Sequence, residues 1–343
     1  MNLVFTDEMN LFAPQSIQAK VELLMLSNLL NNVISPKDSS PVISLVQDTP
    51  IGLYYLSQEK ELKWNDVTLL LSTTSKLDEI LNGEIEYEKR SYSGNELISL
   101  FLPDGMNLKF GDIEIKNGKI KEGSILTGDI FKGKKGNILH YLSTAYDNAM
   151  YIEFVDNMQR ISNMYLYVFH GFTIGINDFR VDEKINDVLI KERFQKVFEV
   201  ENLLTNVEDN KIIDRETYEQ IAYRELDSIK TNQASYVKER LTEKNNMHVM
   251  ASLAKSKGKD SNIGFTMTCL GQCAFEGKLV QYTTNSRTLP YFSKNDDTPA
   301  SRGFIFNNYS SGLKVSEFFY HNLDGRQGII DTATTPCLIE FRF

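Results

Sequence analysis

The sequence has few cysteines, and they do not form a recognisable site. It contains three, Cys269, Cys273 and Cys337, and this small odd number does not supply the disulfide framework of a small secreted protein. Cys269 and Cys273 form one pair without a second pair or a nearby histidine, so their spacing does not match a zinc site. We therefore expect buried free thiols and no zinc.

Long apolar runs and a basic charge balance are also absent. No stretch of about 18 apolar residues occurs, and the amino terminus lacks the basic, apolar and small-residue order of a signal peptide. These absences predict an intracellular protein that has no membrane partner. The 46 Asp and Glu residues outnumber the 37 Lys and Arg residues, which gives a net charge of -9. Because sequence-independent binding of a duplex needs many basic residues, any contact with nucleic acid should be local or shared with other chains.

The length and the mixed local patterns indicate an α+β fold with more than one domain. The 343 residues suffice for about two domains, and their composition of 41% hydrophobic and 24% charged residues is ordinary for a folded protein. Ser16 is expected to cap a helix that reaches about residue 31, and residues 42–46 predict a short buried strand. Asn117-Gly118 lies within the alternating pattern of residues 113–125, which predicts a β-hairpin.

Longer helical patterns occupy the middle of the chain. Apolar residues of the segment 151–168 recur at steps of three and four, which predicts a helix with one buried face. Residues 183–250 predict two long helices with a break near residues 206–214. The second of these helices carries a narrow apolar stripe of Tyr218, Ala222, Leu226 and Ile229. Such a charged rod packs by one edge only.

The segment from residue 255 to 333 is dense in Gly, Pro, Arg and Asp. Residues 270–272 predict a turn in which the amide of Gln272 is free to donate and accept hydrogen bonds. Residues 316–333 predict a helix that contains Gly325 and Gly328. Each glycine costs about 1 kcal/mol relative to alanine in a helix interior. A helix that keeps both is kinked, closely approached by another chain, or required to bend.

Several motifs of this segment occur in one order with characteristic spacings. They are SKGKDSNI (256–263), LGQ (270–272), EGK (276–278), RTLPYFSKND (287–296), SRGF (301–304), GLKVSEFFYH (312–321) and GRQGIIDTA (325–333). In this order they resemble the largest subunit of the multisubunit DNA-directed RNA polymerases, of the eukaryotic type. PVISLVQDT (41–49), HGFTIGIND (170–178) and DEMNL (7–11) extend the resemblance over the whole chain. Departures such as Cys273, where the family usually has a second glutamine, indicate a fast-evolving lineage such as a large DNA virus.

The resemblance implies a division of the chain into four parts. Residues 1–57 correspond to the end of the active-site domain, 58–182 to the pore domain with its helices and β-hairpins, 183–254 to the funnel, a long helical hairpin, and 255–343 to the start of the cleft domain with the first half of the bridge helix. Pro336 is expected to end that helix soon after Ala333. Both ends interrupt the family's sequence, so we expect an internal piece of a larger subunit.

The resemblance also implies roles for individual residues. Asp7 corresponds to one of the three aspartates that hold the catalytic Mg²⁺, and the other two have no counterpart here, so the segment alone is expected to be inactive. Gln272 would face the channel for incoming nucleotides. Thr332 and Ala333 would lie beside the template base near the active centre. Gly325 and Gly328 would let the bridge helix flex during translocation.

The implied activity is template-directed synthesis of RNA from ribonucleoside triphosphates. The implied partners are other polymerase subunits including the second-largest, the DNA template and RNA hybrid, and elongation or transcript-cleavage factors at the funnel. The implied location is the nucleus, or the virus factory or virion if the protein is viral. An alternative from another class is a non-catalytic helical scaffold or interaction module derived from that subunit.

A third interpretation concerns the basic loop of residues 132–136. The loop contains glycine and lysine, as phosphate-binding loops do, but it lacks the required glycine-to-lysine spacing and the Ser or Thr after the lysine. The sequence therefore favours a solvated basic loop over a nucleotide-binding enzyme.

Overall fold

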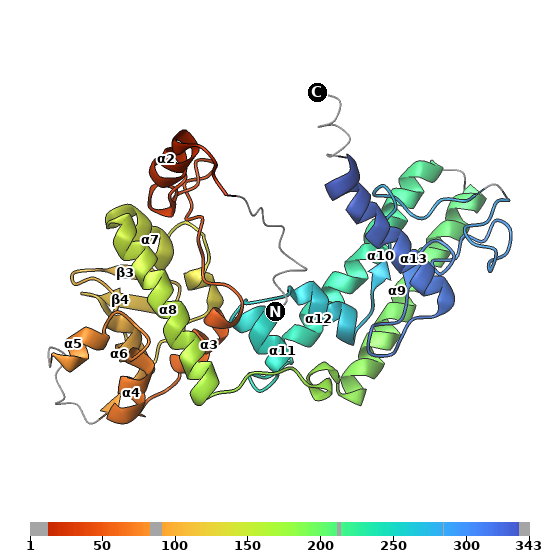
Figure 1. Ribbon diagram of the computed structural model, residues 1–343. Helices are drawn as coiled ribbons and strands as arrows, with labels where there is room; N and C mark the ends of the chain where they lie inside the picture. Colours follow the sequence, from red (N-terminus) through yellow and green to blue (C-terminus); the bar gives the residue numbers. More distant parts are fainter. Residues whose placement is uncertain (1–12, 83–90, 211–213, 284, 336–343) are drawn as a thin grey trace. The chain divides into compact units, whose positions relative to one another are not determined.

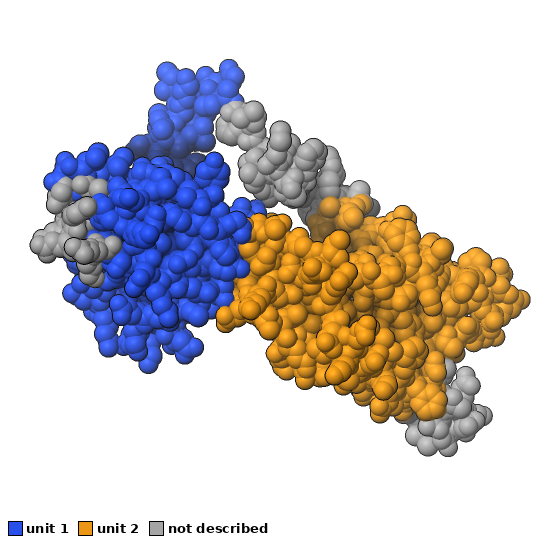
Figure 2. All heavy atoms as spheres, turned by 90° about the horizontal axis from the view of Figure 1, so that it is seen from below, with its two compact units in different colours: residues 1–171 blue, residues 172–343 orange. Residues whose placement is uncertain are grey.

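The computed structural model describes residues 13–82, 91–210, 214–283 and 285–335. The predicted α+β class is confirmed: helices predominate, and the strands form small antiparallel sheets. The chain divides into two compact units, residues 1–171 and 172–343 (Figures 1 and 2). Within the described ranges, no helix has the combination of length and apolar composition that crossing a membrane requires.

Unit 1 contains seven named α-helices in its described part. They are α2 (Ile17–Met25), α3 (Asp48–Leu56), α4 (Trp64–Leu71), α5 (Leu77–Leu81), α6 (Gly94–Ser99), α7 (Ile138–Ala145) and α8 (Asn148–Val168). Short 3-10 turns are η1 (Leu29–Asn31) and η2 (Gly128–Phe131). Strands β1 (Leu62–Lys63) and β2 (Ser91–Tyr92) form one antiparallel pair. A second sheet has the order β3 (Leu108–Phe110), β4 (Ile113–Lys116) and β5 (Lys119–Ile120).

Local sequence signals explain several of these elements. The hairpin predicted at Asn117-Gly118 is confirmed, because both residues have positive φ, 48° and 74°, as a two-residue turn between β4 and β5 requires. Ser93 and Glu96 form a capping box at the start of α6. The helix predicted over residues 151–168 is α8, and its buried face packs on α3.

The core of unit 1 lies between α3, α4, α7 and α8 and the small sheets. Its fully buried residues include Leu53, Leu70, Ile130, Leu142 and Phe154. The cluster takes side chains from Val33 to Tyr165, on both sides of residue 57. The domain boundary expected between residues 57 and 58 therefore does not separate two hydrophobic cores. It stays a proposal about the domains of the parent subunit.

Two expectations for the start of the chain need correction. Ser16 caps a helix as predicted and accepts from the backbone N–H of Ala19, but α2 ends at Met25 and only the turn η1 follows before residue 32. Residues 42–46 do not form a buried strand. Val42 is 60% and Val46 54% exposed, and only Leu45 of this segment is fully buried.

Unit 2 is built around a long helical hairpin. Its described elements are η3 (Ile176–Phe179), α9 (Glu183–Asn210), α10 (Arg215–Lys238), α11 (Asn246–His248), the π-helical turn η4 (Val249–Leu253), α12 (Asp260–Met267), β6 (Gly271–Gln272), β7 (Phe304–Ile305), α13 (Val315–Ile329) and the π-helical turn η5 (Ile330–Thr334). The two predicted long helices are α9 and α10. Strands β6 and β7 pair antiparallel.

The apolar stripe predicted on α10 is confirmed as the contact edge of the hairpin. Tyr218, Ala222, Leu226 and Ile229 are buried and pack with Val197, Val200, Cys269, Leu279 and Phe304. Part of α9 stays exposed beside this edge: Phe198 is 62% exposed, and Phe194, whose ring stacks on Phe306, is 59% exposed. The hairpin thus packs by one edge, as its composition predicts.

Candidate functional site on the C-terminal helix

The first turn of α13 is held by a buried carboxylate. Glu317 accepts hydrogen bonds from the backbone N–H groups of Phe306 (3.0 Å), Asn307 (3.3 Å) and Lys314 (2.9 Å), and from the Asn307 side-chain amide (2.8 Å). It is 6% exposed, and no described cation pairs with it. Four N–H donors satisfy the buried charge and join the helix to the end of β7.

The next turn is anchored by Tyr320, which is 1% exposed. Its ring packs among Leu270, Cys273, Val280 and Ile305. Burial raises the pKa of the Tyr320 phenol to about 12. The base of α13 is therefore fixed by one charged and one aromatic side chain, Glu317 and Tyr320, which lie seven and four residues before the exposed part of the helix begins at Asp324.

Beyond Leu323 the helix has no cover within the described chain. From residue 324 to 335 every residue is exposed except Gln327, which is half-buried, and Ile329 is 65% exposed. A Cβ built on Gly325 or Gly328 meets nothing within 4 Å. No packing among the described residues therefore requires either glycine. A short helix that is largely exposed is only marginally stable in water. This end of α13 would therefore be stabilised by contact with another chain or with nucleic acid.

The predicted active-centre residues Thr332 and Ala333 lie in η5, where the helix widens to π geometry. The Thr332 hydroxyl donates to the backbone oxygen of Gly328 at 2.7 Å. Such π-helical turns occur often at functional sites. Residues 334 and 335 remain helical, and Pro336, which is expected to end the helix, lies outside the described residues.

Gln272 does not have the free amide that the sequence predicts. The residue belongs to β6 and is 3% exposed, and its Nε2 donates to the backbone oxygens of Arg302 (2.8 Å) and Cys273 (2.9 Å). Its Oε1 is buried, and no described residue bonds to it. Cys269 and Cys273 are both buried free thiols, and burial raises the pKa of each.

A network of charged residues around Arg302 was missed by the sequence analysis. Arg302 is 2% exposed, donates to Glu219 at 2.6 Å and lies over the ring of Tyr282. Arg215, the first residue of α10, bonds both carboxylate oxygens of Asp297 at 3.3 and 3.1 Å. This network joins the hairpin to the segment that carries Ser301. The partners lie about 80 residues apart in the sequence, so no local pattern identifies them.

Arg193 is a second missed residue. It is 6% exposed and donates to the backbone oxygens of Thr268 and Phe306 and to the amide oxygen of Gln233. Its guanidinium thereby connects α9 to α10, to the segment that precedes β6 and to the segment that follows β7. The only sequence signal is an arginine within an otherwise apolar helical face.

The predicted metal ligand Asp7 lies outside the described residues. Within the described ranges, no group of three His, Cys, Asp or Glu side chains is arranged to hold a metal ion. The described residues therefore do not fit the implied Mg²⁺, and no chemical step is assigned to them through it.

Comparison with known proteins identifies the family. Residues 32–179 match the family model for RNA polymerase Rpb1, domain 3, and residues 201–305 match that for RNA polymerase Rpb1, domain 4. The chain belongs to the Rpb1 family. This Rpb1 chain is 34% identical over 338 residues to DNA-directed RNA polymerase subunit 1 of Acanthamoeba polyphaga mimivirus. The alignment covers 95% of this chain and 22% of that relative, so the chain spans about a fifth of its length.

The family membership confirms the resemblance drawn from the motifs. The boundary between the two matched Rpb1 domains falls between residues 179 and 201, near the start of α9. Helix α13 lies after the second matched region.

Proposed function

We propose that this Rpb1 chain takes part in template-directed RNA synthesis as a portion of the largest subunit of a DNA-directed RNA polymerase. Two Rpb1 domains in family order and an alignment that covers 95% of the chain support this proposal. The single observation that carries it is the exposed end of α13, a helix that is anchored at its base and uncovered from Asp324 onward. Such a rod suits a position across a cleft formed with other chains.

The small residues of the rod suit a close approach to nucleic acid. The charged residues of this end are Asp324, Arg326 and Asp331, so it offers no basic surface for phosphates. Thr332 and Ala333 instead present small side chains beside which a template base fits. Gly325 and Gly328 supply the bending that translocation requires, since nothing in the described chain packs on them. Gln272 supports the channel for incoming nucleotides by holding the backbone of Arg302.

The complete enzyme would supply the remaining parts. Asp7 would be one ligand of the catalytic Mg²⁺, and the other ligands would come from outside this chain. The second-largest subunit, other subunits, the DNA template and the RNA hybrid would be the partners. The four-part division into active-site end, pore, funnel and cleft is proposed for the parent subunit. The protein would act in the nucleus, or in the virus factory or virion of a large DNA virus.

A second role, as an interaction module, rests on the hairpin. Phe194 and Phe198 lie one turn apart on α9 and are largely exposed. Exposed aromatic pairs of this kind are typical of protein contacts. Elongation or transcript-cleavage factors would dock on this face of the funnel in addition to the role in synthesis.

Replacement of the matching segment of mimivirus subunit 1 by this chain tests the proposal. The chimeric subunit should copurify with the other polymerase subunits and make RNA from a DNA template when Mg²⁺ and all four ribonucleoside triphosphates are present. A second chimera with Ala333→Trp should copurify equally but synthesise RNA at least about tenfold more slowly, because the bulky side chain prevents close approach. A first chimera that fails to copurify, or that copurifies and makes no RNA, would overturn the proposal.

A further inference from the structure

Along the segment 43–46, residues with hydrogen-bonded backbone groups alternate with residues whose backbone groups are unpaired, as in the edge strand of a sheet. The Leu45 N–H donates to the backbone oxygen of Phe131 at 3.1 Å, and the Ile43 oxygen accepts from the Tyr151 hydroxyl. The backbone N–H and C=O groups of Ser44 and Val46 pair with no described residue. In an extended chain the groups of successive residues point to opposite sides, so one side of this segment is bonded to unit 1 and the other is open.

This open side explains why the predicted strand is not formed. Residues 42–46 have the composition of a strand, but the described chain provides no second strand to pair with them. Val42 and Val46 are largely exposed along the same stretch. An exposed edge with unpaired N–H and C=O groups is a ready template for another extended chain.

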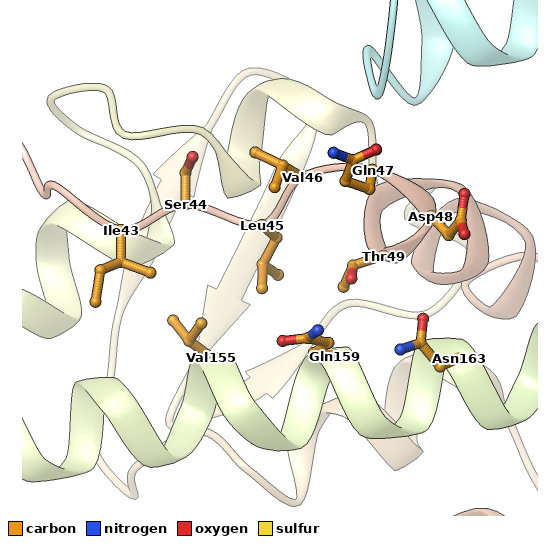
Figure 3. A pocket seen from close by; sticks show the side chains of 10 residues that line it. All are labelled: Ile43, Ser44, Leu45, Val46, Gln47, Asp48, Thr49, Val155, Gln159 and Asn163. Carbon is orange, nitrogen blue, oxygen red and sulfur yellow. The ribbon is translucent and has the colours of Figure 1, made fainter. Parts of the chain in front are cut away.

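A cavity of about 250 Å³ lies beside this edge, lined by residues 43–49 and by Val155, Gln159 and Asn163 of α8. Figure 3 shows Gln159 rising from α8 toward Leu45 and Thr49, and Asn163 rising toward Asp48 at the start of α3. The two residues lie one turn apart, both are exposed, and neither side chain bonds to a described residue. Each free amide group carries both donors and an acceptor, which is the complement of a peptide backbone.

The residue that closes this segment is strained. Gln47 has φ 63° and ψ -126°, a conformation that residues other than glycine rarely adopt. Its cost is about 1–3 kcal/mol, and such strain concentrates at ligand clamps and active sites. The strained residue turns the chain from the extended edge into α3, whose first residue is Asp48. Its position therefore marks the end of the open edge.

The charge of the residues that line the cavity favours a peptide over a nucleic acid as the ligand. Among the lining residues, the only ionisable side chain is the carboxylate of Asp48, and none is Lys or Arg. A phosphate backbone would find no counter-charge here and one repulsive carboxylate. An uncharged peptide backbone finds the groups that it needs, namely unpaired amides and carbonyls and two side-chain amides.

We propose that this groove binds an extended polypeptide, which adds as a strand along residues 44–46 and bonds to Gln159 and Asn163. The proposal is independent of RNA synthesis, since it concerns only unit 1 and a peptide. Alternate side chains of the bound strand would face the cavity, where Leu45 and Val155 favour apolar residues. The unpaired backbone of Ser44 and Val46 would then complete its hydrogen bonds.

A library of random dodecapeptides displayed on phage provides the probe. Selection against the purified chain should enrich peptides with alternating apolar residues, and a synthetic enriched peptide should slow amide exchange at Ser44 and Val46. The double variant Gln159→Ala with Asn163→Ala should weaken binding by about tenfold, because two exposed hydrogen-bonding side chains are lost while the helix is kept. Val46→Pro, which removes one N–H of the edge, should weaken it at least as much.

The matched control is Gln220→Ala, which removes an exposed glutamine from α10 and should leave peptide affinity unchanged. The proposal is overturned if no peptide is enriched, or if enriched peptides bind the groove variants as tightly as the control. It is also overturned if a single-stranded RNA dodecamer protects Ser44 and Val46 and the enriched peptide does not.

Discussion

The hydroxyl of Tyr320 donates a hydrogen bond of 2.6 Å to the backbone oxygen of Ser301. The Thr288 hydroxyl donates to the same oxygen at 2.6 Å, so two buried donors converge on one acceptor. Ser301 belongs to the segment whose neighbour Arg302 bonds to Glu219 of α10. The direction of α13 is thus set by a contact that also involves the helical hairpin.

The Tyr320→Phe variant tests the strength of this contact. It removes the hydrogen bond to Ser301 and the 2.9 Å contact between the Tyr320 and Thr288 hydroxyls but leaves Ser301 bonded to Thr288, so the free energy of unfolding of unit 2 should fall by about 1 kcal/mol. Urea unfolding combined with amide exchange within unit 2 measures the change. Tyr291→Phe is the control, because Tyr291 is 82% exposed and its loss should change the free energy by less than about 0.5 kcal/mol.

The buried tyrosines predict a loss of stability at alkaline pH. Burial raises the pKa of Tyr151 in unit 1 and of Tyr320 in unit 2 from 10.0 to about 12. Between these values the unfolded chain releases a proton that the folded chain keeps, so stability is full below pH 10 and falls as the pH rises toward 12. Each such tyrosine lowers the free energy of unfolding by up to about 1.4 kcal/mol per pH unit in this window.

Unfolding measured at several pH values between 9 and 12, with absorbance at 295 nm to follow ionisation, checks this expectation. In Tyr320→Phe the pH dependence should become shallower in unit 2 and stay unchanged in unit 1. Equal slopes in both proteins would contradict the assignment of the shifted group to Tyr320.

Elements specified by local sequence could be predicted. The turn at Asn117-Gly118, the capping residue Ser16 and the apolar face of α8 each depend on residues within one or two turns of chain. The motifs around Gly325 and Gly328 sufficed to identify the family, because the spacing of such residues reflects backbone requirements shared by its members.

Features that depend on distant partners could not be predicted. Val42 and Val46 have the composition of a strand, but the described chain holds no second strand beside them. Gln272 lies after a glycine, which suggested an exposed turn, whereas pairing of β6 with β7 buries it. Arg302 and Glu219 meet only after folding. Tertiary pairing decided each of these positions.

Replacement of Glu317 by Gln tests the anchor of α13. The amide nitrogen of Gln cannot accept, so the donors from Asn307 and Lys314 that bond to one carboxylate oxygen lose their acceptor. We expect a loss of about 2 kcal/mol in the stability of unit 2, because the lost bonds involve a charged group. Faster amide exchange at Lys314 and the end of β7 would accompany it. Glu276→Gln, at an exposed position, should leave both measurements unchanged.

Alanine at Gly325 and Gly328 tests why this helix keeps two glycines. No described atom lies within 4 Å of either added Cβ, so each substitution should stabilise the exposed end of α13 by about 1 kcal/mol, seen as slower amide exchange from residue 324 to 335. Gly312→Ala is the matched control: its Cβ also meets nothing, but its φ of 81° strains alanine, so stability should fall. In a complete polymerase the double alanine variant should elongate more slowly than the parent, because the rod has lost freedom to bend. Unchanged elongation together with slower exchange would contradict the proposed role of the two glycines in bending.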